Sequence, residues 1–263
     1  MIENDLKNIS LDETMFVIGS GPSLNKIDLS LLKDLNTFGM NRQYVAFDEW
    51  GFSPKYYAIV DWALTVRKYA TDIIPILYES KCKIEKLFVI ADQSTIDQTP
   101  ANLENKVMFI PRFAARLPDD VLEKINREAA YKRHDTPDYV IPSTDQTHKQ
   151  DLISGHSYAN CGTWATSLSY LLGFKRVVLL GIDADFNDLH FHPEYDAYDG
   201  AFEGANPPDQ EAVLTTWSET KKMICGPGFQ GTCDFEIISC TPDSPINSVF
   251  EYIKLESLLE LYE

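Results

Sequence analysis

The stretch Phe16-Val-Ile-Gly-Ser-Gly-Pro-Ser-Leu24 joins an apolar run to a glycine-rich turn. Met15–Ile18 has the length and apolar content of a strand that is buried on both faces, as strands in parallel sheets are. Gly19 and Gly21 allow a sharp turn and a close approach of the backbone to a ligand. Pro22-Ser23 suits the first turn of a helix. The pattern predicts a strand, a turn and a helix start whose free N–H groups face an anion such as phosphate.

The same stretch also fits a tight turn between a strand and a helix that binds nothing. It lacks the third glycine of the dinucleotide-binding fingerprint, and no Gly-Lys-Ser/Thr follows it as in a P-loop. The turn alone therefore leaves a ligand site and a plain connection as open alternatives.

The composition limits the class of protein. The chain has 263 residues, enough for a single α/β domain over residues 1–263, and a net charge of −17. Because binding to nucleic acid requires clustered Lys and Arg, this charge argues against a nucleic-acid partner. Neither a signal peptide nor a transmembrane segment is expected. The five scattered cysteines favour free thiols in a reducing cytoplasm.

Apolar runs alternate with segments of helical periodicity along most of the chain. This alternation predicts a Rossmann-like, doubly wound, mostly parallel sheet. The expected strands are 15–18, 37–42, 56–60, 87–91, 107–110, 176–182 and 236–240. The expected helices are 25–35 (a short helix, or a turn followed by a helix), 44–50, 64–76, 157–172, 210–225 and a C-terminal one. Residues 112–150 are charged and contain proline, so they are interpreted as an inserted lid or flexible loop.

Polar side chains follow several of these strands. Asn41 comes after the second strand, Asp61 after the third, and Asp183-Ala-Asp185 after the strand at 176–182. Open α/β sheets bind ligands at the carboxyl ends of their strands, so these side chains are candidates for binding. Asp183 and Asp185 could hold Mg²⁺ or Mn²⁺ if the reaction depends on a metal. Alternatively, Asp183 caps local backbone groups and Asp185 is solvated.

Two histidines follow the aspartates. Residues two apart in an extended chain face the same side, so His190 and His192 could both point into the site. Imidazole titrates near neutral pH, which suits a base that deprotonates an acceptor hydroxyl. Tyr195 could donate a hydrogen bond to a leaving phosphate. The other interpretation is that these side chains only pack in an aromatic loop.

The motifs resemble those of two groups of proteins. Ile18-Gly-Ser-Gly-Pro-Ser-Leu24, Gly39-Met-Asn41, Ser154-Gly155 and Leu180-Gly-Ile-Asp183 occur in the order seen in bacterial lipooligosaccharide sialyltransferases. The same order occurs in proteins similar to 6-hydroxymethylpterin diphosphokinase and to motility accessory factors. The sialyltransferases transfer sialic acid from CMP-sialic acid without a metal, in a Rossmann-like fold with a lid. The resemblance covers residues 14 to 260 outside the lid.

The resemblance implies a transferase that binds a nucleotide or nucleotide-sugar, with a CMP-sugar favoured, and a glycan or small-molecule acceptor. The residues that would contact the nucleotide are Gly19, Ser20, Gly21, Ser23, Asn41, Asp61, Ser154, Gly155 and Asp183. His190, His192 and Tyr195 are the catalytic candidates. The oligomeric state stays open.

Three differences from the sialyltransferases are visible. Those enzymes have an arginine just before Ser154-Gly155, where this chain has Asp151-Leu-Ile, and they have asparagine where Asp61 stands. Their general-base histidine lies well beyond the Gly-Ile-Asp strand, whereas in this chain no histidine follows His192. The leading hypothesis is a sialyltransferase-like glycosyltransferase that acts on a surface glycan. A Mg²⁺-dependent diphosphokinase of the hydroxymethylpterin type and a non-catalytic nucleotide-binding protein are the alternatives.

Overall fold

A computed structural model describes residues 6, 8–61, 64, 68–79, 82–91, 93–103, 105–111, 161–185, 190–193, 210–225 and 235–262. In this part of the chain, seven parallel strands form one sheet in the order β5-β4-β3-β2-β1-β6-β7. The strands are β1 (Thr14–Ile18), β2 (Thr37–Met40), β3 (Tyr56–Ile59), β4 (Lys86–Ala91), β5 (Val107–Pro111), β6 (Arg176–Leu180) and β7 (Glu236–Ser239). The predicted parallel α/β fold is confirmed.

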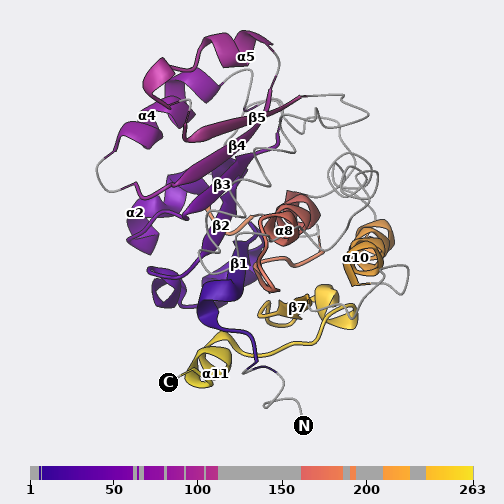
Figure 1. Cartoon of the computed structure of the whole chain (residues 1–263). Coiled ribbons are helices and arrows are strands. Elements are labelled where there is room, and N and C mark those ends of the chain that lie inside the picture. The colour runs from indigo at the N-terminus through magenta and orange to yellow at the C-terminus, as the bar shows by residue number, and fades with distance from the viewer. Residues whose placement is uncertain are drawn as a thin grey trace.

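Helices cover both faces of the sheet, as a doubly wound fold requires. In Figure 1, α8 (Cys161–Leu171) and α10 (Gln210–Cys225) lie on one side of the sheet, and α2 (Phe47–Trp50) and α4 (Ile74–Tyr78) lie on the other. The remaining α-helices are α5 (Gln93–Asp97) and α11 (Leu255–Glu260). The prediction for 210–225 is confirmed. The helix expected over 157–172 is confirmed from Cys161 to Leu171, and residues 157–160 lie outside the described residues.

One helix prediction was wrong in kind. Residues 25–35 do not form one helix but parts of two 3-10 turns, η2 (Pro22–Lys26) and η3 (Leu29–Leu32). Ile27 between them is extended, with φ −116° and ψ 131°. The Asp28 side chain then accepts a hydrogen bond from the Ser30 N–H and starts the second turn. The local capping chemistry therefore interrupts a periodicity that suggested a continuous helix.

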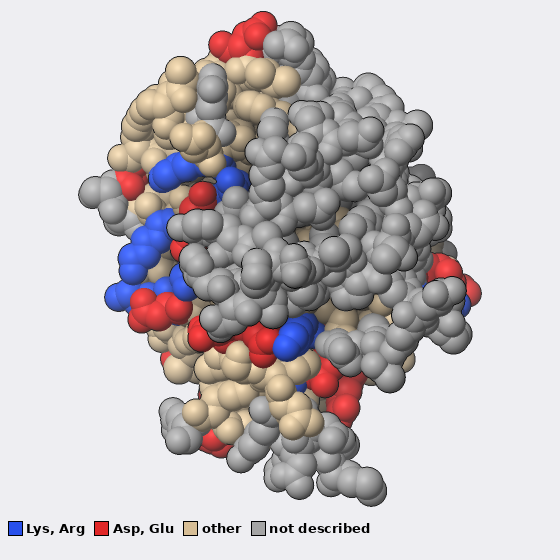
Figure 2. Space-filling view, viewed as in Figure 1, with Lys and Arg blue, Asp and Glu red and all other residues tan. Residues whose placement is uncertain are grey.

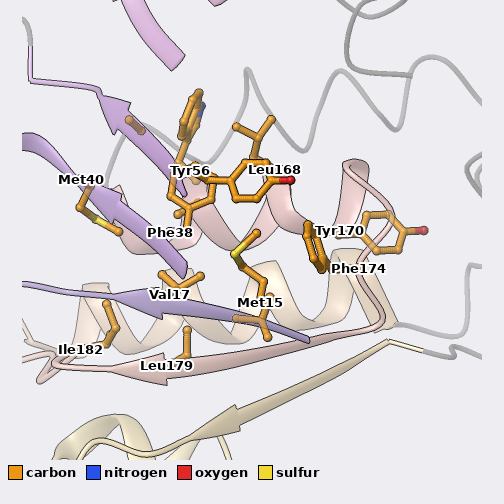
Figure 3. Close-up of a cluster of buried hydrophobic side chains, with 14 of the residues drawn as sticks. Met15, Val17, Phe38, Met40, Tyr56, Leu168, Tyr170, Phe174, Leu179 and Ile182 are labelled. Carbon is orange, nitrogen blue, oxygen red and sulfur yellow. The ribbon is translucent and has the colours of Figure 1, made fainter. Parts of the chain in front are cut away.

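The two faces of the sheet have separate apolar cores, because alternate residues of a strand point to opposite faces. On the α8 face, Met15, Val17, Phe38 and Tyr56 pack against that helix, as Figure 3 shows. On the other face, one cluster includes Phe16 and Ile18 and packs against η3 and α11. A second cluster on this face includes Tyr57 and Ile59. β1 is completely buried on both faces, as its apolar run predicted.

The charged side chains of the described residues are mixed in sign on the face shown in Figure 2, where Lys and Arg lie among Asp and Glu. Among the described residues, no helix is both long and apolar enough to cross a bilayer.

The amino ends of β6 and β7 carry a buried arginine. Arg176 is fully buried, and its guanidinium group binds the Glu236 carboxylate, with N–O distances of 2.7 and 2.9 Å. It also donates hydrogen bonds to the carbonyl groups of Leu6 (2.7 Å) and Ile9 (3.3 Å) and to the Tyr262 hydroxyl. One side chain thus joins the sheet to the first and last described segments of the chain.

Candidate functional site

The strand order reverses direction between β1 and β6, which lie side by side although 157 residues separate Ile18 from Arg176 along the chain. In doubly wound folds, ligands bind at this switch point, outside the carboxyl ends of the strands. The residues that leave the two strands here are Gly19 on β1 and Gly181 on β6. The glycine turn of the sequence analysis therefore lies at the position where the fold class places a ligand.

The turn is bound tightly to the end of β6. The Gly19 N–H donates to the Leu180 carbonyl at 2.6 Å, and the Gly21 N–H donates to the Gly181 carbonyl at 2.9 Å. These two N–H groups are therefore not free to bind a phosphate. Backbone hydrogen bonds between the neighbouring strand ends use them, since the parallel pairing of β1 and β6 continues into the turn.

The glycines are required by close contact between the two loops. A Cβ atom at Gly19 would lie 2.3 Å from the Gly181 carbonyl oxygen. A Cβ atom at Gly21 would lie 1.6 Å from Asp183 Oδ2. Both distances are far below contact distance, so any side chain at these positions would push the two loops apart. The absence of side chains lets the Asp183 carboxylate lie against the turn.

Asp183 is bonded to the residue after the turn. Its Oδ2 accepts hydrogen bonds from the Ser23 hydroxyl at 2.8 Å and from the Ser23 N–H at 3.4 Å. The Ser244 hydroxyl donates to the Asp183 carbonyl at 2.6 Å and so helps to fix the backbone of this loop. The next residue, Ala184, has a φ of 53°. Ser23 and Asp183, which the sequence suggested separately, form one unit at the switch point.

The Asp183 carboxyl is partly buried in this position. Burial raises its pKa above the ordinary value of 3.8, and the negative charge of Asp185 acts in the same direction. The hydrogen bonds from Ser23 and the positive charge of Lys26 lower the pKa and offset part of this rise. The folded protein thus holds the proton of Asp183 more tightly than the unfolded chain does.

We expect a pH-dependent stability effect from this group. Because the pKa of Asp183 is raised in the folded protein, protonation of its carboxyl stabilises the fold. This stabilisation is complete below about pH 3.8, the ordinary pKa of the group, and is lost as the pH rises through the folded-state pKa. Asp183→Asn cannot ionise, so its stability relative to the wild type should be greater at pH 7 than near pH 4. Urea denaturation at the two pH values measures this difference. Asp185→Asn removes a charge from the same loop as a control, and an equal pH dependence in both variants would contradict the assignment.

Asn41 connects three elements at the same edge of the sheet. Its Oδ1 accepts hydrogen bonds from the N–H groups of Val60 (3.0 Å) and Asp61 (3.1 Å), which follow β3. Its Nδ2 donates to the Cys161 sulfur, 3.1 Å away at the start of α8. Among the described residues, the second Nδ2–H of Asn41 has no partner. The sequence placed Asn41 and Asp61 at this edge correctly, but not the contact between them.

The Cys161 thiol is not a nucleophile at neutral pH. Burial raises its pKa to about 11, the hydrogen bond from Asn41 lowers it in part, and the charge of Asp61 raises it. The thiolate is the reactive form of cysteine, so a thiol with this pKa stays protonated and unreactive. Cys161 therefore acts here as a hydrogen-bond partner of Asn41.

Gln43 is a site residue that the sequence analysis missed. It is fully buried at the start of η4 (Asn41–Ala46), and its Nε2 donates to the carbonyl groups of Ile18 (2.7 Å) and Gly19 (2.6 Å). Its Oε1 accepts the Met40 N–H at 2.9 Å. Gln43 thereby fixes the carboxyl ends of β1 and β2 relative to each other. A polar residue beside the predicted Asn41 was the only available sign of this role.

The histidine segment lies against the glycine turn. The Phe191 N–H donates to the Ser20 carbonyl at 3.0 Å, and Asn25 Nδ2 donates to the Phe191 carbonyl at 2.9 Å. The Phe191 ring is buried and packs against Trp50, with ring centroids 5.6 Å apart. This anchor brings His190 and His192, which flank Phe191, to the turn. Sequence reasoning named both histidines and, in its alternative interpretation, packed them with the aromatic side chains of this loop, but it did not foresee that Phe191 binds the glycine turn.

His192 has an acidic partner that lies far from it in the sequence, on α2. Its Nε2 lies 3.1 Å from the Glu49 carboxylate at the end of α2, and its side chain is only 12% exposed. A carboxylate that holds an imidazole in this way fixes the orientation of the ring. Glu49 was not among the sequence candidates, because nothing local links residues 49 and 192.

The described residues do not form a complete metal site. Among them, no group of three or more His, Cys, Asp or Glu side chains is arranged to hold a metal ion. Mg²⁺ takes about six oxygen ligands, and one oxygen of Asp183 is already shared with Ser23. A metal bound by Asp183 and Asp185 thus stays a prediction. Tyr195, Ser154, Gly155 and the proposed lid at 112–150 lie outside the described residues.

No family model matches the sequence, and no curated protein matches it. Solved structures of sialyltransferases do resemble the fold. One is the monofunctional α-2,3-sialyltransferase Cst-I from Campylobacter jejuni, which is 16% identical, with a TM-score of 0.56, over 95% of this chain and 82% of that one.

Two further structures are similar to the same extent. CST-II in complex with a trisaccharide acceptor and CMP is 16% identical, with a TM-score of 0.53, over 91% of this chain and 85% of that one. CstII from Campylobacter jejuni with the substrate analogue CMP-3FNeuAc is 16% identical, with a TM-score of 0.51, over 91% and 84%. The relation to motility accessory factors stays a prediction. The predicted resemblance to bacterial sialyltransferases is confirmed, and at these identities what the chain shares with them is the fold.

Proposed function

We propose that this protein is a glycosyltransferase that moves a sugar, such as sialic acid, from a CMP-activated donor to a hydroxyl group of a glycan acceptor. The observation that carries the proposal is the polar edge of the sheet at the switch point, where Ser23 and Asp183 lie against a glycine turn and Asn41 follows the neighbouring strand β2. It occurs in a fold shared with sialyltransferases that were solved with CMP and with a CMP-sugar analogue. Fold alone does not decide chemistry, so the experiments below test the site.

The donor nucleotide would lie along the carboxyl ends of β1, β2 and β6. The second Nδ2–H of Asn41, which has no partner within the described part of the chain, can donate a hydrogen bond, and the carboxylate of Asp183 can accept one from a ribose hydroxyl. The space that side chains would take at Gly19 and Gly21 is filled by Gly181 and Asp183, so the glycines would serve the ligand by placing the Asp183 carboxylate against the turn. The glycine amides are engaged with β6, so phosphate binding would fall to other groups, for which Ser154 and Gly155 remain candidates.

His190 and His192 are the candidates for the general base. The base would take the proton of the acceptor hydroxyl as its oxygen attacks the donor sugar, while CMP leaves with the bonding electrons of the sugar–phosphate bond. The anchor of Phe191 on Ser20 supports this role, because it holds both histidines beside the proposed nucleotide site. The pair formed by His192 and Glu49 fixes the imidazole ring on one side. Tyr195 remains a candidate for stabilising the leaving phosphate.

The first test is the binding of CMP in the presence of EDTA. A ligand that binds only the folded protein stabilises it by mass action, so CMP at 100 times its Kd should raise Tm by about 5–10 °C. UDP, GDP and ADP should raise it much less. A shift that appears only with ADP or ATP plus Mg²⁺ would instead favour the diphosphokinase alternative. CMP binding without any transfer or hydrolysis of a CMP-sugar would favour a non-catalytic protein.

The second test separates binding from chemistry. His190→Gln and His192→Gln are compared with the wild type for CMP affinity and for turnover of a CMP-sugar. The base should lose about 100-fold or more in kcat with CMP affinity retained. The other histidine is the matched control, since it lies on the same anchored segment. Turnover equal to that of the wild type in both variants would exclude both histidines as the general base.

A further inference from the structure

The Asn41 backbone has an unusual conformation. Its φ is 51°, in the left-handed region that asparagine tolerates better than most residues. This conformation lets the chain turn sharply from β2 into η4, so that the Asn41 side chain reaches both β3 and α8. The position of Asn41 at the proposed nucleotide site therefore depends on whatever holds this turn.

The Tyr57 hydroxyl holds the turn. It donates a hydrogen bond to the Asn41 carbonyl at 2.7 Å and accepts one from the Tyr44 N–H at 3.0 Å. These two backbone groups are the ones that a 3-10 turn pairs with each other, three residues apart. The hydroxyl bridges them and is buried, since Tyr57 is only 1% exposed. A single phenol on β3 thus fixes the first turn of η4, where Asn41 stands.

Gly39 makes room for this ring. Gly39 on β2 is directly paired with Tyr57 on β3, and a Cβ atom at Gly39 would lie 2.8 Å from Tyr57 Cε2 and 2.6 Å from Pro54 Cγ. The ring consequently lies across β2 above the glycine and points towards the end of the strand. Phe47 packs edge-on against the ring from α2, with centroids 5.6 Å apart. The ring is therefore packed between β2 and Phe47 while its hydroxyl holds the turn.

We propose that Tyr57 is a positioning residue of the nucleotide site, which acts by holding Asn41 in its left-handed conformation. The inference rests on the proposed function, because it assigns Tyr57 to the site where the donor would bind. Tyr57 lies on the face of the sheet opposite α8 and acts on the ligand only through Asn41. Asn41 in turn accepts hydrogen bonds from the N–H groups of Val60 and Asp61 and donates one to Cys161 at the start of α8.

Tyr57→Phe tests the proposal, because it removes the hydroxyl and keeps the ring. CMP affinity, measured by calorimetry at a temperature where all variants are folded, should fall about 10-fold, as expected when a buried hydrogen bond that orders a site is lost. Tyr56→Phe is the matched control. Tyr56 precedes Tyr57 on β3, is also fully buried, and points to the α8 face (Figure 3). Its variant should bind CMP within about 2-fold of the wild type.

Amide hydrogen exchange gives a readout that needs no ligand. In Tyr57→Phe, exchange at Val60 and Asp61 should accelerate selectively, because their acceptor on Asn41 is no longer held in place. Gly39→Ala should act in the same direction by displacing the ring, provided that the variant folds. If the wild type does not bind CMP but exchange changes as expected, the proposed function fails and the role of Tyr57 in holding Asn41 stands. If neither exchange nor CMP affinity changes in Tyr57→Phe, the inference is overturned.

Discussion

Arg176→Met is expected to lower the free energy of unfolding by about 3 kcal/mol, because it removes the charged hydrogen bonds of a fully buried guanidinium group whose partner, Glu236, is partly exposed. Arg176 is fully buried, and its guanidinium group satisfies the Glu236 carboxylate and the carbonyl groups of Leu6 and Ile9 together. Methionine fills much of the volume but donates no hydrogen bond. The Tyr262 hydroxyl also donates to the Leu6 and Ile9 carbonyl groups, at 2.9 and 2.8 Å, so the cost comes from the lost guanidinium hydrogen bonds and the lost ion pair.

Urea denaturation measures this loss, and Lys175→Met is the control. Lys175 is the preceding residue, and its ion pair with Glu13 is partly exposed, with 41% of the lysine side chain accessible. Exposed pairs contribute about 0–1 kcal/mol, so the control should stay within about 1 kcal/mol of the wild type. An Arg176→Met protein as stable as Lys175→Met would show that Tyr262 and the solvent replace the guanidinium group without cost.

Gly19→Ala is expected to have the largest effect at the proposed site. The added Cβ would lie 2.3 Å from a backbone oxygen, that of Gly181, which no side-chain rotation can relieve. The ends of β1 and β6 would have to separate, at the expense of the 2.6 Å hydrogen bond from the Gly19 N–H to the Leu180 carbonyl. We expect a loss of about 3 kcal/mol in stability and a loss of CMP binding of about 10-fold or more.

Gly51→Ala controls for the general cost of replacing a glycine. Gly51 has a φ of 70°, which alanine adopts at a cost of about 1–2 kcal/mol, but no atom lies within 4 Å of its added Cβ. This variant should be mildly destabilised and should bind CMP normally. Thermal denaturation and CMP calorimetry on both variants separate the two effects. Normal CMP affinity in Gly19→Ala would place the ligand away from the switch point.

The strands could be predicted because each is a local apolar run. Met15–Ile18 and Arg176–Leu180 are short, mostly apolar segments bounded by glycine or polar residues, and both are strands buried on both faces. The helices were less predictable. Two 3-10 turns replace the helix expected over 25–35, because the capping side chain of Asp28 outweighs a weak periodicity. Candidates at strand ends, such as Asn41 and Asp183, followed from the rule that parallel strands present their carboxyl ends at one edge.

The links between the site residues could not be predicted in the same way. Asp183 and Ser23 are 160 residues apart, and so close in space that Gly21 between them can carry no side chain. His192 and Glu49 are 143 residues apart. Gln43 looks like any polar residue in the sequence, yet it binds the carbonyl groups of Ile18 and Gly19 from within the core.

The sequence by itself determined the parallel α/β fold, the glycine turn at its edge and the set of polar residues beside that turn, because these depend on local composition and period. Only the tertiary structure decided how the turn is used. The pairing of β1 with β6 directs the Gly19 and Gly21 amides to backbone carbonyls, and the packing of Tyr57 across Gly39 sets the position of Asn41. These contacts depend on which strands become neighbours in space, and that order is a property of the folded chain as a whole.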